Sequence, residues 1–390
     1  MMRKKLIITF ICFIGFIFAY LKFDVLANTD TLTSGAKASI LIELHTGEIL
    51  YEKNIHEKLA PASMTKIMST HLIIDALVSG QIKMEDIVTV SAHAASFGGS
   101  QVWLETGEQM SVEDLFKCMV IASANDATVA LAELVAGSED LFVQRMNKKV
   151  QDLGLINTHF VDPTGLSDFE TGHYSSAYDM AMMARGLLLE HEALTTKYSS
   201  IYEDYIRQDT NDPFWLVNTN KLVKHVPGID GLKTGWTRKA GYNLTATMKK
   251  AGMRLISVVM GEETPSKRNY DTVSLLNYGF SQYEAVEYKS KGYHIGDYDN
   301  LLLTPQKVKI VTKEPIYFLT KKGVKPSGLE ENFTYYIDKS GVKKGSEIGK
   351  LEIIKKGKVA YTVPLTVEQD CRRASFFQVI GRVLKTVLFK

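Results

Sequence analysis

The sequence predicts an α+β protein in three parts: a large domain with an antiparallel sheet and a cluster of helices, a small all-β domain, and a C-terminal amphipathic helix. Helical and strand-like patterns alternate up to about residue 285. Short alternating strands with Lys/Gly turns then follow over residues 286–370, and helical spacing returns over 371–390. With 390 residues, 45% of them hydrophobic, the chain is long enough for such a multidomain fold.

The N-terminus has the pattern of a secretory signal peptide. Arg3, Lys4 and Lys5 precede an apolar run over residues 6–20, and small residues suited to cleavage end at Ala27. The run is shorter than the ~20 residues that a membrane span prefers, although a retained transmembrane anchor is the alternative. We therefore expect residues 1–27 to be removed and the protein to be exported.

Composition argues against several classes of function. The net charge of +2 is too small to indicate nucleic acid as a partner. The three cysteines lie far apart, without the spacing of a zinc site or a disulfide framework. None of the nine histidines belongs to a His-Glu-x-x-His motif, which argues against a metal-dependent peptidase. We expect neither a metal nor another cofactor.

The large domain, residues 28–285, begins with a hairpin signal. Residues 38–44 and 48–52 are strand-like and flank a short turn. A helix is expected from Ser63 onward, and Ser111 opens a capping box before a helix that stops near Ser123. The elements expected after it are a helix at 127–135, a loop at 162–166, a helix at 178–189, and strands at 229–234, 242–248 and 254–260.

The remaining parts are simpler. Within residues 286–370 the expected strands are 307–311, 316–319, 350–354 and 359–364. Residues 372–390 place their apolar side chains on one side of a helix, with Arg373, Gln378, Arg382 and Lys385 on the other. A basic amphipathic helix of this kind suits a membrane surface with anionic lipid, although a helix that docks on its own domain has the same pattern.

Ser63 and Lys66 are the first candidate functional residues. Three residues apart at the start of a helix, they share one face, which brings an amine beside a hydroxyl. A desolvated, neutral lysine can activate a serine as a nucleophile. A Ser-x-x-Lys match is nonetheless expected about once by chance in a chain of this length. Whether Ser63 is a nucleophile therefore depends on evidence from other segments of the chain.

Two further segments carry polar groups at breaks in apolar regions. Ser123-Ala124-Asn125 lies between two expected helices, where capping residues of a simple turn are the alternative. Lys233-Thr234-Gly235 is expected to end a strand, where a solvated lysine is the alternative.

The three motifs together resemble those of the penicillin-recognising serine enzymes, in the same order and behind a signal peptide. Within this superfamily the chain is similar to the D-alanyl-D-alanine carboxypeptidases among the low-molecular-weight penicillin-binding proteins. The resemblance covers roughly residues 35–285 and implies a β-lactamase/transpeptidase-like fold. Further similar stretches are residues 50–54, 98–101, 162–166 and 239–244.

The resemblance implies the reaction and its main residues. Ser63 would attack the penultimate D-alanine of a peptidoglycan stem peptide that ends in D-Ala-D-Ala, and β-lactams would acylate the same hydroxyl. Lys66 would be the general base, with its pKa lowered by burial and by Lys233. Ser123 would relay a proton to the leaving amine, and Asn125 would hold the substrate amide.

The resemblance also implies a binding site for the terminal carboxylate. Lys233 and Thr234 would bind it, and Gly235 would leave the strand edge free for a peptide to lie along it. The backbone amides of Ser63 and Trp236 would form the oxyanion hole. Arg268 is a further candidate for carboxylate recognition. The enzyme would act at the outer face of the cytoplasmic membrane, held there peripherally by residues 372–390.

Two positions depart from the family pattern. Ala124 stands where relatives often have glycine or aspartate, and Trp236 stands where some have histidine, so only the backbone role of Trp236 carries over. Three alternatives remain open: a class A β-lactamase, a D,D-endopeptidase and a non-catalytic penicillin- or peptidoglycan-binding protein. The first needs a Glu-x-x-Leu-Asn motif, which residues 123–233 lack.

Overall fold

The computed structural model describes residues 32–388, apart from 168–170, 208–212 and 356. The signal peptide expected at residues 1–27 therefore lies outside the described residues. The N-terminal part is built on a five-stranded antiparallel sheet with the order β2-β1-β9-β8-β7, which makes β7 an edge strand. Its strands are β1 (Ala38–Glu43), β2 (Ile49–Lys53), β7 (Ile229–Thr237), β8 (Gly241–Lys250) and β9 (Met253–Glu262).

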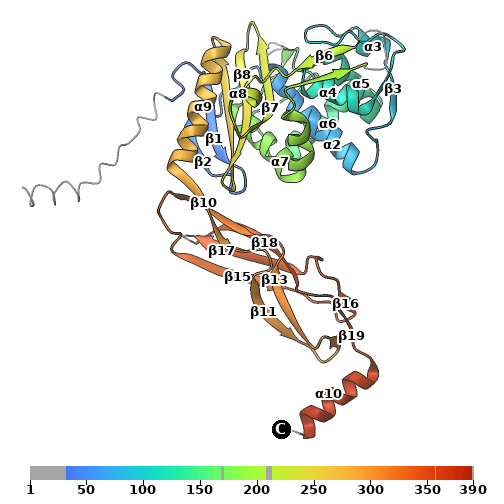
Figure 1. The fold of residues 1–390 in the computed structure, drawn as a ribbon, viewed down its shortest axis with the longest axis vertical. Helices are drawn as coiled ribbons and strands as arrows, with labels where there is room; N and C mark the ends of the chain where they lie inside the picture. The colour runs from blue at the N-terminus through green and yellow to red at the C-terminus, as the bar shows by residue number, and fades with distance from the viewer. Residues whose placement is uncertain (1–31, 168–170, 208–212, 356, 389–390) are drawn as a thin grey trace, which may run out of the picture.

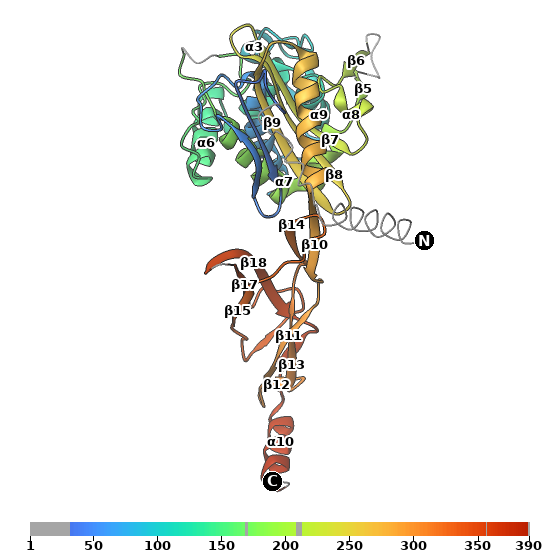
Figure 2. The same cartoon turned by 90° about the vertical axis from the view of Figure 1, so that its left-hand side faces the viewer.

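Helices cover both faces of this sheet (Figures 1 and 2). The side chains of β1 show how: Ile40 and Ile42 pack into the core beneath α2 and α7, whereas Leu41 packs into the core beneath α9. A strand buried on both faces reads as a continuous apolar run, as β1 does. The helices are α2 (Lys66–Val78), α3 (Ala92–Ala95), α4 (Val112–Val120), α5 (Asn125–Ala136), α6 (Glu139–Asp152), α7 (Ala177–Ser199), α8 (Leu222–His225) and α9 (Pro265–Gln282).

The expected hairpin, strands and helices are confirmed, with differences at their ends. Ser111 caps α4 by accepting a hydrogen bond from the Asp114 amide at 3.1 Å. The predicted helix at 178–189 continues to Ser199 as α7, past a kink at His191, where φ is −140° and ψ is 35°. Nε2 of His191 lies 2.7 Å from Oδ1 of Asp75 on α2, so side-chain contacts hold the two helices together across the kink.

A second, all-β part extends away from the first beyond α9 (Figure 1). The four predicted strands are confirmed, and β10 spans the residue where the sequence predicts the domain boundary. Paired strands build this part: β10 (Tyr283–Lys289), β11 (His294–Asp299), β12 (Leu303–Thr304), β13 (Lys307–Thr312), β14 (Ile316–Lys321), β15 (Leu329–Tyr335), β16 (Gly341–Val342), β17 (Gly349–Lys355), β18 (Lys358–Val367) and β19 (Cys371–Arg373).

The C-terminal helix α10 (Phe376–Leu388) lies at the far end of the molecule from the first part (Figures 1 and 2). It begins later than predicted, because residues 371–373 form β19, which pairs with β12 and β16. Arg373 therefore belongs to a strand and not to the polar face of the helix. Among the described residues, no helix combines the length and the apolar character that crossing a membrane requires.

Two small two-stranded sheets complete the first part. β3 (Ile87–Thr89) pairs with β4 (Gln109–Ser111), and β5 (Glu203–Ile206) pairs with β6 (Phe214–Val217). The β5–β6 hairpin is joined to the edge of the main sheet near β7, where the Thr234 hydroxyl donates to the Thr219 hydroxyl at 2.8 Å.

Candidate active site

Ser63 lies in a tight turn, η2 (Ala62–Thr65), that leads directly into α2. The sequence predicts Ser63 inside the helix, but the helix begins only at Lys66. Asn243 of β8 holds the start of this turn, because its Nδ2 donates to the carbonyl oxygens of Ala60 at 3.1 Å and Pro61 at 3.3 Å. The Ser63 side chain is half-buried, so its hydroxyl is open on one side.

Lys66 is completely buried and has three oxygen partners. Its Nζ lies 3.2 Å from the Ser63 hydroxyl, 2.6 Å from Oδ1 of Asn125 and 2.8 Å from the carbonyl oxygen of Thr164. Burial lowers the pKa of Lys66 to about 7, although the carboxylates of Asp162 and Asp126 oppose this shift. The predicted effect of burial is confirmed. The charges that act most strongly on Lys66 are these two carboxylates, which raise its pKa, and not Lys233.

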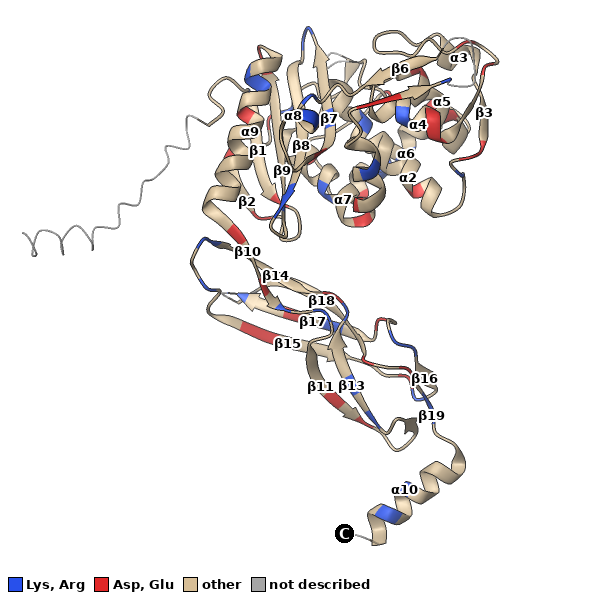
Figure 3. Ribbon diagram, viewed as in Figure 1, with Lys and Arg blue, Asp and Glu red and all other residues tan. Residues whose placement is uncertain are grey.

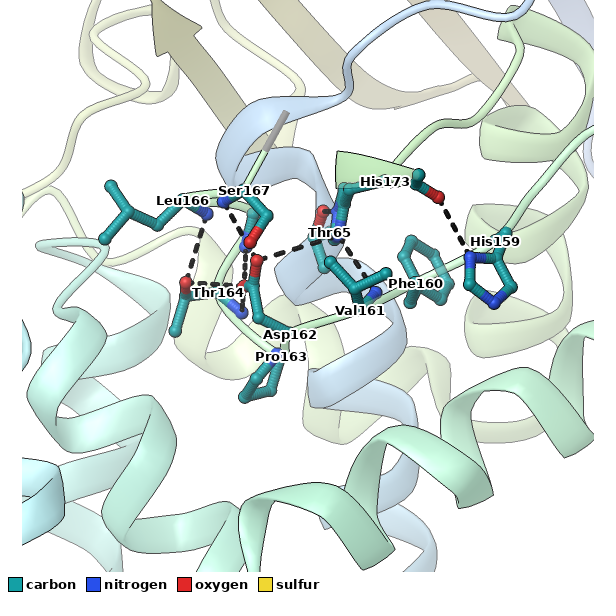
Figure 4. Close-up of polar contacts among 12 residues, drawn as sticks. Thr65, His159, Phe160, Val161, Asp162, Pro163, Thr164, Leu166, Ser167 and His173 are labelled. Atoms are coloured by element: carbon teal, nitrogen blue, oxygen red, sulfur yellow. Dashed lines mark hydrogen bonds and ion pairs between the residues drawn. The ribbon is translucent and has the colours of Figure 1, made fainter. Parts of the chain in front are cut away.

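The carbonyl of Thr164 is positioned by a loop that Asp162 organises (Figure 4). Oδ1 of Asp162 accepts hydrogen bonds from the amides of Thr164 and Gly165, each at 2.6 Å, and from the Thr164 hydroxyl at 2.7 Å. Its Oδ2 accepts from the Ser167 amide at 2.9 Å. Burial raises the pKa of Asp162, but the charge that His173 carries at low pH and these hydrogen bonds hold it well below its usual range. Residues 162–167, the Asp162 loop, therefore surround a carboxylate that stays ionised.

The Asp162 loop packs directly against the Ser63 turn. Gly165 has a φ of +78°, and a Cβ there would lie 1.9 Å from the Ala62 carbonyl oxygen. Buried His173 joins the two segments from the other side: its Nε2 lies 2.8 Å from the Thr65 hydroxyl, and its Nδ1 accepts from the Val161 amide at 3.2 Å (Figure 4). The acceptor role of Nδ1 assigns the proton to Nε2, so neutral His173 donates to Thr65.

Asn125 contacts Lys66 from the break between α4 and α5, the segment in which Ser123 also lies. Besides its bond to Lys66, Asn125 donates through Nδ2 to the Gly98 carbonyl oxygen at 2.7 Å. Ser123 has a positive φ of 66°, which turns its side chain away from either helix. Its buried Oγ has no hydrogen-bond partner among the described residues. A buried hydroxyl without a protein partner is a group that a ligand could satisfy.

Lys233 and Thr234 lie inside β7, because the strand runs on to Thr237 instead of ending at the triplet as predicted. Both side chains are buried. Burial, the charge of Lys66 and that of Arg268 together hold the pKa of Lys233 well below its usual value. The positive charge of Lys66 therefore disfavours protonation of Lys233. A bound carboxylate would favour the charged form of Lys233.

Gly235 has a packing role besides the predicted one. A Cβ there would lie 2.5 Å from the Pro61 carbonyl oxygen and 3.1 Å from the Met64 amide nitrogen. The glycine therefore lets β7 approach the Ser63 turn closely, and its expected role in clearing the strand edge for a peptide stays a prediction. Because β7 is the edge strand, its outer side is available for that purpose in any case.

Two predicted residues lie at the border of the site. The Trp236 side chain is 56% exposed, and its ring lies 5.8 Å from the ring of Tyr242. Arg268, on α9, is buried, and burial lowers its pKa to about 10. Its guanidinium donates to the Asn269 side chain at 2.8 Å and 3.1 Å, and its charge acts on Lys233. Arg268 is thus close enough to influence the Lys233 region electrostatically.

A buried lysine amine that contacts a half-buried serine hydroxyl, on this sheet and under these helices, is the arrangement of a serine enzyme that works through an acyl intermediate. Comparisons with known proteins give the family. The family model described as D-alanyl-D-alanine carboxypeptidase matches residues 26–264, and the model for the C-terminal domain of penicillin-binding protein 5 matches residues 283–373. The chain belongs to the D-alanyl-D-alanine carboxypeptidase family of serine peptidases.

Individual relatives agree with this membership. The chain is 46% identical to the D-alanyl-D-alanine carboxypeptidase DacF of Bacillus subtilis, over 92% of this chain and 91% of the relative. It is 34% identical to DacC of Escherichia coli, over 96% and 93% of the two chains. Among solved structures, penicillin binding protein 5 from Haemophilus influenzae matches with a TM-score of 0.68 at 33% identity, over 87% of this chain and 98% of that one. These names favour a carboxypeptidase over the endopeptidase alternative.

Sequence reasoning assigned no individual role to four residues that build the site, although residues 162–166 and 239–244 are among the stretches similar to the family: Asp162, Thr164, His173 and Asn243. Thr164 acts through its backbone carbonyl, which leaves no trace in residue type. Asp162 could have been found, since an aspartate followed by Pro-Thr-Gly is typical of a loop closed by its own carboxylate. His173 and Asn243 are buried polar residues whose partners are distant in sequence, and only the fold brings them together.

Gly235→Ala should slow acylation by penicillin at least about 100-fold, because the new Cβ would displace the Ser63 turn and the backbone N–H groups beside it. The rate of reaction with a fluorescent penicillin measures this effect. Gly296→Ala is the control, since nothing lies within 4 Å of a Cβ at that position. Equal rates for Gly235→Ala and the wild type would contradict the close packing of β7 on the turn.

Asp162→Asn should shift the pH dependence of acylation to lower pH. The carboxylate of Asp162 raises the pKa of Lys66, so its removal should lower the midpoint from near pH 7 by up to about one unit. The asparagine oxygen can still accept the three bonds made to Oδ1. Asp162→Glu keeps the charge and serves as the control for altered geometry. A midpoint that moves equally in both variants would argue against an electrostatic effect.

Proposed function

We propose that Ser63 is the nucleophile of this D-alanyl-D-alanine carboxypeptidase and that neutral Lys66 is its base. The observation that carries the proposal is the 3.2 Å contact between Nζ of the fully buried Lys66 and the hydroxyl of the half-buried Ser63. A pKa of about 7 means that a large fraction of Lys66 is neutral at physiological pH. A general base works best when its pKa lies near the operating pH.

The other two partners of Lys66 support the direction of proton transfer. A neutral amine has two N–H groups and one lone pair. The carbonyl oxygens of Asn125 and Thr164 can only accept, so they take the two N–H groups. The lone pair is then left for the third partner, the Ser63 O–H. Asn125 and Thr164 therefore orient the amine as a base, in addition to any contact that Asn125 makes with substrate.

The proposed reaction has two steps, acylation of Ser63 and hydrolysis of the resulting ester. Lys66 takes the hydroxyl proton as Ser63 Oγ bonds to the carbonyl carbon of the penultimate D-alanine. The C–N bond then breaks, and the proton returns to the departing D-alanine amine through Ser123, whose hydroxyl is otherwise without a partner in the described part of the chain. Water next attacks the ester with Lys66 again as base, which releases the shortened peptide and restores Ser63.

Lys233 and Thr234 are proposed to bind the terminal carboxylate, with the substrate laid along the outer edge of β7. A carboxylate bound there would stabilise the protonated form of Lys233, which burial disfavours in its absence. An internal peptide bond offers no such charge, so this residue would select chain ends. The backbone N–H groups of Ser63 and Trp236 are proposed to hold the oxyanion, and Arg268 to support the positive potential.

Incubation with penicillin followed by mass spectrometry tests the assignment of Ser63. One covalent adduct is expected, on the peptide that contains Ser63, and Ser63→Ala should show none while keeping its circular dichroism spectrum. Ser123→Ala is the matched comparison, because it also removes a hydroxyl from the site. This variant should still form the adduct, but more slowly than the wild type. An adduct on another serine, or an unmodified wild type, would overturn the proposal.

We also propose that α10 holds the exported enzyme on the outer face of the cytoplasmic membrane. Its apolar side chains are exposed instead of packed on the protein: Phe376, Phe377, Ile380, Val383, Leu384, Val387 and Leu388. The sequence from residue 371 to 390 contains five basic residues and no acidic one, and Figure 3 shows only basic charge on the helix. An exposed apolar face with basic flanks suits the surface of a bilayer that contains anionic lipid.

Leu384→Asp should release the protein from lipid vesicles. Burying a leucine in the membrane interface contributes about 1.5–3 kcal/mol, so vesicle affinity should fall roughly 10- to 100-fold. Cosedimentation with vesicles of phosphatidylglycerol and phosphatidylcholine measures the affinity. Val359→Asp changes an equally exposed apolar residue of the β domain and should leave binding unchanged. Equal losses in the two variants would place the contact elsewhere.

A further inference from the structure

The polar face of α10 is attached to the β domain through one narrow stripe. Val379 and Arg382 are the two residues of the helix that are not exposed. Arg382 and Gln378 lie about one turn apart, on the side opposite the apolar residues. The helix therefore has two different sides. One side contacts the β domain, and the opposite, apolar side is exposed and free to meet lipid.

Arg382 makes the strongest of these contacts. Its Nη1 donates to the carbonyl oxygens of Leu301 at 2.7 Å and Leu303 at 2.6 Å, and its Nη2 donates to the Thr304 hydroxyl at 3.2 Å. Gln378 adds to the attachment, since its Oε1 lies 3.3 Å from the same Thr304 hydroxyl and accepts from the Ser375 amide at 2.9 Å. A planar guanidinium that donates in three directions fixes orientation better than a single point charge could.

The receiving segment, residues 300–304, is itself well anchored and is called the tip loop here. Leu303 is completely buried in the core of the β domain and pairs with Arg373 of β19. The Leu302 amide donates to the Asn300 side chain at 2.9 Å, and its carbonyl accepts from the Ala374 amide at 2.7 Å. The contacts of Arg382 therefore connect the helix to a rigid part of the domain.

The same contacts bear on the charge of Arg382. Its partners are neutral carbonyl and hydroxyl oxygens, which occupy the donors of the guanidinium without cancelling its charge. Three of the five N–H groups of the guanidinium are thus directed at the tip loop. Lys385, nearly one turn further on, is exposed and is better placed to meet an anionic headgroup.

We propose that Arg382 sets the angle between the membrane-binding helix and the β domain, so that the enzyme stands on the membrane in one orientation. This inference rests on the proposed membrane role of α10. Arg382 would then be a positioning residue that contacts the tip loop, and Lys385 would contact the lipid headgroups. The amphipathic helix would be rigidly attached to the β domain, and the β domain would hold the active site at a fixed height above the bilayer.

Arg382→Lys separates the two roles, because lysine keeps the charge but cannot form the three-way contact. Spin labels on Thr386→Cys and Glu330→Cys, both exposed positions, report the distance between helix and domain by double electron–electron resonance. The native Cys118 and Cys371 are buried and therefore shielded from the label. The parent chain should give one narrow distance distribution. Arg382→Lys and Arg382→Ala should both broaden it, whereas Lys385→Gln should not. A distribution that stays narrow in Arg382→Ala would overturn the proposal.

Vesicle cosedimentation completes the test. Arg382→Ala and Arg382→Lys should bind anionic vesicles within about twofold of the wild type, whereas Lys385→Gln should bind about fivefold more weakly at low salt. If Arg382→Ala loses as much affinity as Lys385→Gln while Arg382→Lys keeps it, Arg382 is a lipid ligand and the proposal fails. Failure of the wild type to bind vesicles would instead overturn the membrane role of α10, and the orientation on a membrane with it. Unchanged penicillin acylation in every variant verifies that the first domain is intact.

Discussion

Placing an amine in the protein interior, beside a hydroxyl and away from water, is the constraint on which the site depends. A charged lysine is costly to bury, so the surroundings of Lys66 must favour the neutral form while still satisfying its hydrogen bonds. Asn125 and Thr164 satisfy the two N–H groups with neutral oxygens. Asp162 keeps the pKa from falling further. The result is an amine whose pKa is about 7, so that the neutral form, which a general base needs, is populated at neutral pH.

Three segments distant in sequence must meet closely for this to happen, and unusual backbone positions permit it. Ser123 and Gly165 both have a positive φ, and Gly235 lies where a Cβ would touch the Ser63 turn. These positions bring the α4–α5 break, the Asp162 loop and β7 against one turn of chain. A positive φ at a residue other than glycine, such as Ser123, is typical of functional sites, where the surrounding structure holds the conformation in place.

Much of the fold and of the candidate site could be predicted from the sequence, for identifiable reasons. Apolar periodicity gives the sheet and helices, and the order of three motifs points to Ser63, Lys66 and Lys233. Contacts through the backbone could not be predicted, since the Thr164 carbonyl would be the same in any residue. The start of α10 was predicted too early because residues 371–373 suit a strand only once β12 and β16 are beside them.

The backbone origin of the Thr164 contact has a consequence for how the enzyme can change by mutation. An acceptor supplied by the main chain cannot be removed by replacing a side chain, so position 164 is protected against loss of this partner of Lys66. Variation that weakens this one contact would have to act indirectly, through the carboxylate at 162 or the glycine at 165. Both changes would also disturb turnover of the natural peptide, which narrows the routes to drug resistance at this site.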